Sequence, residues 1–119
     1  NDLRVDGSGS VYAVDTVGRA VYVFDPSGAL SSSFGAWSDE GVLFFPVSIA
    51  VNNKGDIYVL DSHRGRIEVF DRSGALEFTV SRKGVGVGEV YNPSYLFIDA
   101  AGRLYVIDGA RVQVFQEGK

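Results

Sequence analysis

Three aspartates recur at a constant spacing, and their carboxylates are the first candidates for chemistry. Asp15, Asp61 and Asp108 lie 46 and 47 positions apart, each at the end of a short apolar run. Carboxylates that repeat in this way could surround a hard cation, which needs roughly six to eight oxygen ligands converging on one point. The same side chain can instead cap the turn that follows it, by accepting backbone N–H groups. We expect the capping role and keep the three aspartates as weak metal candidates.

The second candidate is the only histidine of the chain, His63. An imidazole can act as a general base near neutral pH. The chain has no second histidine for a metal pair and no serine in the glycine-flanked setting of a nucleophile,. We therefore expect no catalytic residue, and we interpret His63 and its neighbour Arg64 as loop residues that could contact a ligand or partner.

The glycine-rich stretch SRKGVGVGEVYNP, residues 81–93, is similar at first sight to a phosphate-binding loop. In the dinucleotide fingerprint a third glycine would occupy the position of Glu89,. The fingerprint also leads into a helix, whereas Pro93 precedes another apolar run,. No lysine followed by serine or threonine completes a P-loop. The alternating glycines therefore predict a connection between two structural units.

Composition excludes several classes of protein. The net charge of -4 and the pI of about 4.8 disfavour a nucleic-acid partner, which needs a basic surface. No apolar run approaches the ~18 residues of a membrane-spanning helix. The absence of cysteine removes disulfides and thiolate chemistry,. The chain has no methionine, even at position 1, and no signal-peptide pattern,. We therefore expect a processed or excised chain that works in an extracellular or periplasmic location.

The chain repeats itself with a period of 46 or 47 residues, in copies that begin at Leu3, Ile49 and Leu96,. Each copy holds short runs of β-branched and aromatic residues between turn signals, and no run keeps a helical period. The runs VYAV, IYVL and LYVI are apolar throughout, which predicts a strand covered on both faces. The runs VYVF, IEVF and VQVF tolerate a polar residue and predict a strand nearer the rim. ALSSSF and ALEFTV predict a fourth, outer strand.

The turns between these runs share one form. Asp6, Asn52 and Asp99 each precede a glycine by three positions, and Asp25 and Asp71 repeat the pattern further along. Asp or Asn at the start and glycine at the end predict a type I turn that closes with positive φ. Each copy is therefore an antiparallel meander of four strands. Its length fits a β-propeller blade, whose repeats run about 40–50 residues.

The stretch PVSIAVNNKGDIYVLDSHRGRIEVFDRSG, from Pro46 to Gly74, resembles an NHL repeat, and the glycine-rich stretch resembles that family's connection between repeats. The resemblance extends over nearly the whole chain and is clearest in the second copy. It implies an all-β propeller, commonly with six blades, that serves mostly as a binding platform. It also implies that Arg66 and Arg111 brace adjacent blades. A minority of related propellers are metal-dependent enzymes, including amidating lyases and lactonases.

The stretches between the repeats carry varied surface chemistry. Trp37 lies in the first of them, and Arg82, Lys83 and Tyr91 lie in the second. Aromatic and charged side chains on adjacent loops suit a binding face. We predict partner contacts at these residues, with Trp37 the first candidate. The aromatic side chains could instead pack beneath the edge of a blade.

The repeats do not add up to a closed ring. We divide the chain into blade 1 at 1–46, blade 2 at 47–93 and an incomplete blade 3 at 94–119, about 2.75 blades together,. The end blades would expose apolar faces and a strand edge to water. The chain could be part of a longer propeller, several chains could close one ring, or chains could stack into a filament. The side chains expected to pack between blades are those of Val11, Val14, Ile57, Val59, Leu104 and Val106.

We therefore predict a non-enzymatic scaffold or protein-interaction module that self-assembles through blade faces and strand edges and needs no cofactor. Its expected partners are other copies of itself, further blades or another protein. The alternative is part of a larger six-bladed propeller, either a binding platform or a metal-dependent enzyme similar to lyases and lactonases. A platform for ligands or RNA is a third possibility, and the acidic balance argues against RNA,.

Overall fold

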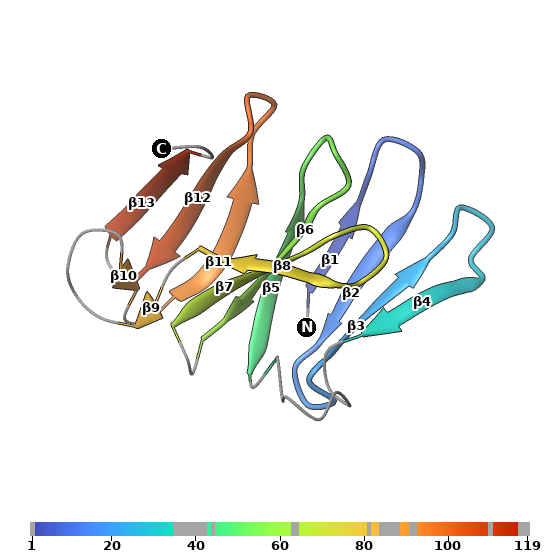
Figure 1. The fold of residues 1–119 in the computed structure, drawn as a ribbon, viewed down its shortest axis with the longest axis horizontal. Coiled ribbons are helices and arrows are strands. Elements are labelled where there is room, and N and C mark those ends of the chain that lie inside the picture. The colour runs from blue at the N-terminus through green and yellow to red at the C-terminus, as the bar shows by residue number, and fades with distance from the viewer. Residues whose placement is uncertain are drawn as a thin grey trace.

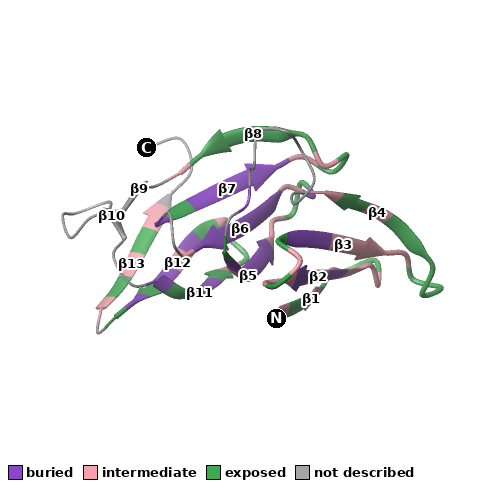
Figure 2. Ribbon diagram, turned by 90° about the horizontal axis from the view of Figure 1, so that it is seen from below, coloured by how far each residue is buried: buried purple, intermediate pink, exposed green. Residues whose placement is uncertain are grey.

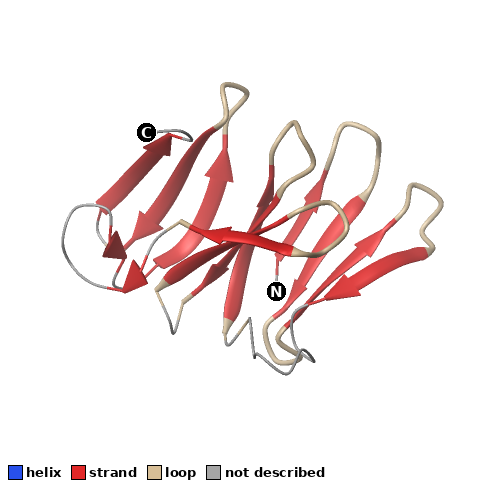
Figure 3. Cartoon of the chain, viewed as in Figure 1, coloured by secondary structure: helices blue, strands red, loops and turns tan. Residues whose placement is uncertain are grey.

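The computed structural model describes residues 2–34, 43, 45–62, 65–80, 82–83, 89–90, 93–109 and 111–116, with the backbone alone at 82–83, 89–90 and 116. Within these residues every regular element is a β-strand (Figure 3). This part of the chain contains no helix that is long and apolar enough to cross a membrane.

The strands form three antiparallel sheets, which we call blades 1, 2 and 3. Blade 1 has the order β1-β2-β3-β4, with β1 Asp2–Val5, β2 Val11–Asp15, β3 Ala20–Phe24 and β4 Leu30–Phe34. Blade 2 has the order β5-β6-β7-β8, with β5 Pro46–Val51, β6 Ile57–Asp61, β7 Arg66–Phe70 and β8 Leu76–Thr79. Blade 3 has the order β11-β12-β13, with β11 Pro93–Ile98, β12 Arg103–Asp108 and β13 Arg111–Gln116. Between blades 2 and 3, β9 Arg82–Lys83 pairs in parallel with β10 Glu89–Val90.

The three blades lie side by side in sequence order, with blade 2 between blades 1 and 3 (Figure 1). The first strands of the blades, β1, β5 and β11, run along one side of the molecule, and the outer strands β4 and β8 run along the other (Figure 2). We call β1, β5 and β11 the inner strands. This arrangement is that of consecutive propeller blades around an axis, so the predicted fold class is confirmed,.

The hairpin turns follow the predicted chemistry. In the turn after β1, Asp6 Oδ1 accepts the backbone N–H groups of Ser8 and Ser10 at 2.9 and 3.0 Å. Gly9 closes the turn with φ of 93° and donates its N–H to Asp6 O. A positive φ is costly for residues with a Cβ, so glycine is needed there. The corresponding glycines at 28, 55, 74 and 102 have φ between 85° and 93°.

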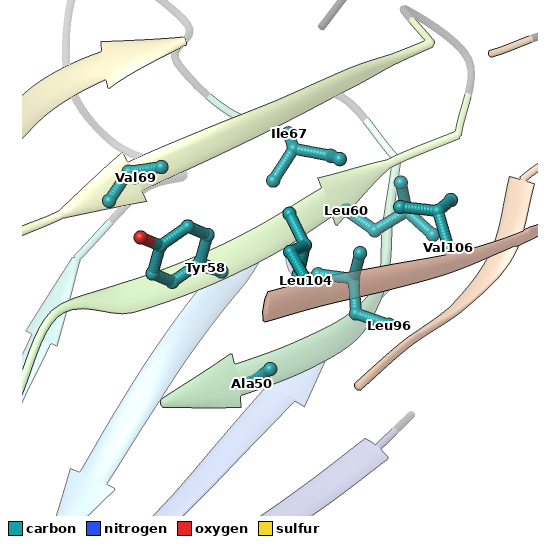
Figure 4. Packing of buried hydrophobic residues seen from close by; sticks show 8 residues of the cluster. All are labelled: Ala50, Tyr58, Leu60, Ile67, Val69, Leu96, Leu104 and Val106. Carbon is teal, nitrogen blue, oxygen red and sulfur yellow. The ribbon is translucent and has the colours of Figure 1, made fainter. Parts of the chain in front are cut away.

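Apolar side chains fill the two spaces between neighbouring blades. Blades 1 and 2 enclose one cluster, in which Phe34 of β4 packs against Phe70 of β7 with ring centroids 4.7 Å apart. Blades 2 and 3 enclose the other, shown in Figure 4, whose members are Ala50, Tyr58, Leu60, Ile67, Val69, Leu96, Leu104 and Val106. Burial of such side chains contributes roughly 1.5–3 kcal/mol each. The core of the chain therefore lies between its sheets.

Burial on both faces holds only for the middle blade. Every residue of β6 is buried, whereas burial alternates along β2 and β12. The reason is position, because blade 2 has a neighbour on each side and the end blades have one. Five of the six residues expected between blades are buried, and Val11 is partly exposed because it faces away from blade 2,. The third strand of each copy was expected near the rim, where a polar residue is tolerated. In blade 2 this expectation is wrong at Glu68, which is only 2% exposed.

Candidate interaction surfaces

Blade 3 presents an open apolar face on the side away from blade 2. We call the side of any blade turned toward the next blade its forward face. On the forward face of blade 2, Ile67 and Val69 are 0% exposed because blade 3 covers them. The equivalent residues of blade 3, Val112 and Val114, are 63% and 54% exposed. The other exposed apolar residues of this face are Tyr95, Phe97 and Ile107.

Blade 1 presents the complementary open face. We call the side turned toward the preceding blade the rear face. On the rear face of blade 2, Ile49 is 0% exposed and packs in the cluster shared with blade 1. Its equivalent in blade 1, Leu3, is 61% exposed, and Val5 beside it on the same face is 67% exposed,. The two end blades therefore expose one forward face and one rear face, the same two kinds of face that pack together inside the chain.

Polar side chains link the inner strands of successive blades. Asp2 Oδ2 of β1 accepts a hydrogen bond from Ser48 Oγ at 3.0 Å and another from the backbone N–H of Ile49 at 3.2 Å. Ser48 Oγ in turn accepts the backbone N–H of Leu96 at 3.0 Å. Asp2 and Ser48 occupy equivalent positions, so each accepts the same backbone donor of the next blade. Ser48 is 0% exposed, and these bonds satisfy donors that would otherwise be buried without a partner,.

Arg4 connects the first inner strand to the third. Its Nη1 donates to Asp2 Oδ1 at 2.9 Å and to Leu3 O at 2.7 Å, and its Nη2 donates to Leu96 O at 3.1 Å. The guanidinium carbon also lies 4.8 Å from the centre of the Tyr95 ring. The forked head of arginine suits this mixture of carboxylate, carbonyl and aromatic partners.

The two arginines implied to brace the blades have different surroundings. Arg111 donates from Nη2 and Nε to Asp108 Oδ2 at 2.9 and 3.2 Å, within blade 3. Arg66 is exposed at the start of β7, where its backbone pairs with that of Asp61. The contacts described for these two residues do not decide the bracing role, which stays a prediction. The contacts of Arg4, by contrast, join two blades directly.

The periodic aspartates end the second strand of each blade, and each has a different partner. Asp15 Oδ1 accepts the N–H of Gly18 at 3.0 Å, inside the turn that follows. Asp61 Oδ1 accepts the N–H of Phe45 at 3.1 Å, and Phe45 directly precedes the first strand of blade 2. Asp108 receives the guanidinium of Arg111. Among the described residues no group of three or more His, Cys, Asp or Glu side chains is arranged to hold a metal ion.

Tyrosines reinforce two of the hairpin turns at the end of the blades that is uppermost in Figure 1. The hydroxyl of Tyr12 donates to Asp6 Oδ2, and that of Tyr105 donates to Asp99 Oδ2, both at 2.8 Å. Burial, together with the Asp6 carboxylate, raises the pKa of Tyr12 to about 12. The backbone N–H of Arg103 and the Tyr105 hydroxyl hold the pKa of Asp99 at about 2. These contacts stabilise the turns and leave the carboxylates ionised at neutral pH.

Most of the predicted partner-binding residues lie outside the described part of the chain. Trp37, His63, Arg64 and Tyr91 are not among the described residues. For Arg82 and Lys83 the structure gives the backbone only, in β9. The prediction of partner contacts at these residues therefore stays a prediction.

Sequence reasoning overlooked the polar residues of the inner strands. A signal was present at Ser48, which interrupts the apolar run PVSIAV at a position where the first repeat also has a polar residue, Asp2. Arg4 carried no such signal, since its equivalents are Ala50 and Phe97. Its partner in another blade, the carbonyl oxygen of Leu96, belongs to a residue 92 positions away in the sequence. Only the folded arrangement brings them together.

The family model of the NHL repeat matches residues 45–70, which run from the residue before β5 to the end of β7. This stretch of the chain matches the NHL repeat. The resemblance noted in the sequence is thereby confirmed for the second blade. No curated protein matches the sequence significantly.

Solved propeller structures share the fold of this chain at low sequence identity. A streptogramin B lyase matches with a TM-score of 0.70 and 12% identity, over 98% of this chain and 40% of that one. A putative gluconolactonase matches with a TM-score of 0.72 and 19% identity, over 98% and 43%. The WD40 β-propeller domain of Doa1 matches with a TM-score of 0.70 and 18% identity, over 98% and 36%.

These similarities show the fold and leave the activity open. Identities of 12–19% between chains of one architecture are compatible with unrelated functions,. The chain spans about 40% of the length of the propellers that it matches. It is therefore a set of propeller blades that corresponds to less than half of those rings.

Proposed function

We propose that the chain is a non-enzymatic scaffold that binds other copies of itself through the open faces of blades 1 and 3. One observation carries the proposal. Val112 and Val114 are 63% and 54% exposed, although Ile67 and Val69 at the same positions of blade 2 are completely buried. Contiguous exposed apolar surface of this kind typically marks a binding site.

The partner fits because the two open faces correspond to the two sides of an interface already present in the chain. Inside the chain, the forward face of blade 2 packs on the rear face of blade 3. The forward face of blade 3 on one copy can meet the rear face of blade 1 on another, which exposes Leu3 and Val5. This contact joins copies head to tail. It yields a ring if the rotation closes and a filament if it does not.

The test is the mass of the purified chain in solution, measured by light scattering behind a sizing column, with electron microscopy of the same sample. We expect discrete oligomers or filaments. Val114→Lys places a charge on the forward face of blade 3 and should shift the chain toward monomer. Val17→Lys is the matched control, because Val17 is 92% exposed in the turn after β2 and lies on neither face. A parent chain that stays monomeric up to high concentration would overturn the proposal.

A second candidate function follows from the share of the matched propellers that the chain covers. The open faces could pack against further blades of one longer propeller, which would act as a binding platform or as an enzyme. The coverage of 36–43% of the matched chains favours this reading. In that case the 119-residue chain should be a monomer that melts without cooperativity,.

The absence of metal-dependent activity is a separate part of the proposal with its own test. We expect no change in melting temperature when Ca²⁺ or Zn²⁺ is added to the chain. A rise in melting temperature that grows with metal concentration would favour the enzyme reading. Substitution of Asp15 by Asn would then show whether the periodic aspartates bind the ion.

A further inference from the structure

We propose that Arg4 is a clasp that sets the angle through which the three blades turn around their common axis. The angle at the middle blade is measured by the distance between the first and third inner strands, β1 and β11. Packing between blades fixes the spacing of neighbouring inner strands. The distance between β1 and β11 then determines the curvature of the three blades around their axis. Arg4 belongs to β1, and its guanidinium bonds to β11.

The contacts of Arg4 form a closed circuit with all three inner strands. The guanidinium donates to Leu96 O at 3.1 Å, while the N–H of the same residue donates to Ser48 Oγ at 3.0 Å. Ser48 donates to Asp2 Oδ2 at 3.0 Å, and Asp2 Oδ1 receives Arg4 at 2.9 Å. A circuit of this kind resists opening and closing alike, because neither movement leaves its bonds intact.

The positions around the circuit suit a clasp between blades that are not neighbours. Ala50 stands in β5 at the position of Arg4, and it is 3% exposed. It is the smallest of the three side chains at this position, the others being Arg4 and Phe97. The Tyr95 ring gives the guanidinium a flat surface 4.8 Å away. Arg4 is about one quarter exposed, at 23%, so its ion pair with Asp2 is partly shielded from water,.

The clasp has a consequence that rests on the proposed function. Tight curvature closes a ring with few blades, and loose curvature needs more blades or leaves a filament open. If copies associate through their end faces, the geometry held by Arg4 determines how many copies complete one turn. Arg4 is then the residue that determines the size of the assembly, although its hydrogen bonds all lie along the inner strands and Tyr95 is its one contact on the forward face of blade 3.

The experiment measures the angle directly with a pair of spin labels. The chain has no cysteine, so Ala29→Cys and Ala101→Cys supply the only thiols. Both alanines are exposed, Ala29 in the turn between β3 and β4 and Ala101 in the turn between β11 and β12. Pulsed electron resonance then reports the distance between blades 1 and 3. Dilution with unlabelled chain suppresses distances between copies.

We expect one narrow distance distribution in the labelled parent and a broader distribution, shifted to longer distances, for Arg4→Met. Arg4→Lys keeps the positive charge near Tyr95 and loses the fork, so it should lie between the two. Arg103→Met is the matched control, because Arg103 pairs with Asp99 at 2.8 Å inside blade 3. It should leave the distribution unchanged. Equal distributions for the parent and Arg4→Met would overturn the proposal.

Two further measurements keep the outcome decisive. If circular dichroism shows that Arg4→Met does not fold, Tyr95→Leu removes the aromatic contact and is judged by the label distances alone, because Tyr95 also lies on the open forward face of blade 3. Light scattering compares the number of copies in the assemblies of the parent and of a folded Arg4 variant, Arg4→Met or Arg4→Lys. A chain that never associates would overturn the proposed scaffold function, while the label distances would still decide whether Arg4 holds the angle.

Discussion

Glu68 is a carboxylate inside an apolar interface. It lies in the middle of β7, is 2% exposed and faces blade 1. The hydroxyl of Thr79 in β8 donates a hydrogen bond to its Oε1. The equivalent residue of blade 3 is Gln113, whose amide donates to Asp108 Oδ2 at 3.4 Å. At the same position the fold thus accepts a charged and an uncharged side chain of similar size.

The first prediction concerns this pair. Thr79→Val removes the hydroxyl and keeps the shape of the side chain, so a buried carboxylate loses a donor. We expect the free energy of unfolding to fall by about 1–3 kcal/mol, the cost of an unsatisfied buried polar group. Urea denaturation measures the difference.

The control for Thr79→Val is Glu68→Gln, which introduces the residue found in blade 3. An amide costs less to bury than a carboxylate, so this variant should be as stable as the parent or more stable. In the Glu68→Gln background, Thr79→Val should have a smaller effect. An equal loss in both backgrounds would mean that the charge of Glu68 does not matter.

Among the elements, the hairpin turns repeat one set of hydrogen bonds with two different side chains. Asp99 Oδ1 accepts the N–H groups of Ala101 and Arg103, both at 2.9 Å. Asn52 Oδ1 accepts those of Lys54 and Asp56 at the same distance of 2.9 Å. The turn therefore needs an acceptor oxygen, which Asn and Asp both supply. Only Asp adds a negative charge, and that charge depends on pH.

The second prediction uses this natural control. The pKa of Asp99 falls from 3.8 to about 2 in the folded chain, mainly because the backbone N–H of Arg103 favours the charged form. A depressed pKa contributes stability above pH 3.8 that is lost as the pH falls toward 2,. Asp99→Asn should therefore reduce the drop in melting temperature between pH 5 and pH 2. An identical drop in parent and variant would contradict this assignment.

The third prediction compares two glycines at equivalent turns. Gly28 and Gly74 have φ of 92° and 93°, so an alanine at either position is strained by about 1–2 kcal/mol,. A Cβ at Gly28 meets open space, whereas one at Gly74 would lie 2.9 Å from the Phe34 ring of blade 1. Gly74→Ala should therefore destabilise the chain more than Gly28→Ala. Chemical denaturation of both variants checks the order, and equal losses would show that the ring moves aside without cost.

At the element scale the sequence predicted a great deal. Short runs of β-branched and aromatic residues identified the strands of the blades, and the repeated Asp or Asn with Gly three positions later identified the hairpins, because both signals are local. The polar links between blades were missed. Asp2, Ser48 and Arg4 find their partners in strands about one or two repeats away. A single sequence does not show which residue of one repeat faces which residue of the next.

For the molecule as a whole, the middle blade differs from the end blades. Blade 2 contributes buried residues to both apolar clusters, and β6 is buried along its whole length. Blades 1 and 3 each contribute to one cluster. Local opening is governed by buried contacts, so stability should decrease from the centre of the chain toward its ends.

The fourth prediction follows from that gradient. In hydrogen exchange under native conditions, the amides of β6 and β7 should exchange most slowly, and those of β4 and β13 faster. If copies associate as proposed, dilution should speed exchange in β12 and β13 more than in β6, because dilution uncovers the forward face of blade 3. Uniform protection across the three blades would contradict the gradient.

The hydrogen bond between Arg4 and Leu96 also bears on the order of folding. Each blade is a meander whose strands pair with their neighbours in sequence, so its loops are short and close quickly,. The Arg4 bond joins residues 92 positions apart, and the entropy of closing so long a loop is recovered only after the intervening blades have formed. The clasp is therefore a late event in folding. Substitution of Arg4 should speed unfolding and leave the rate of blade formation unchanged.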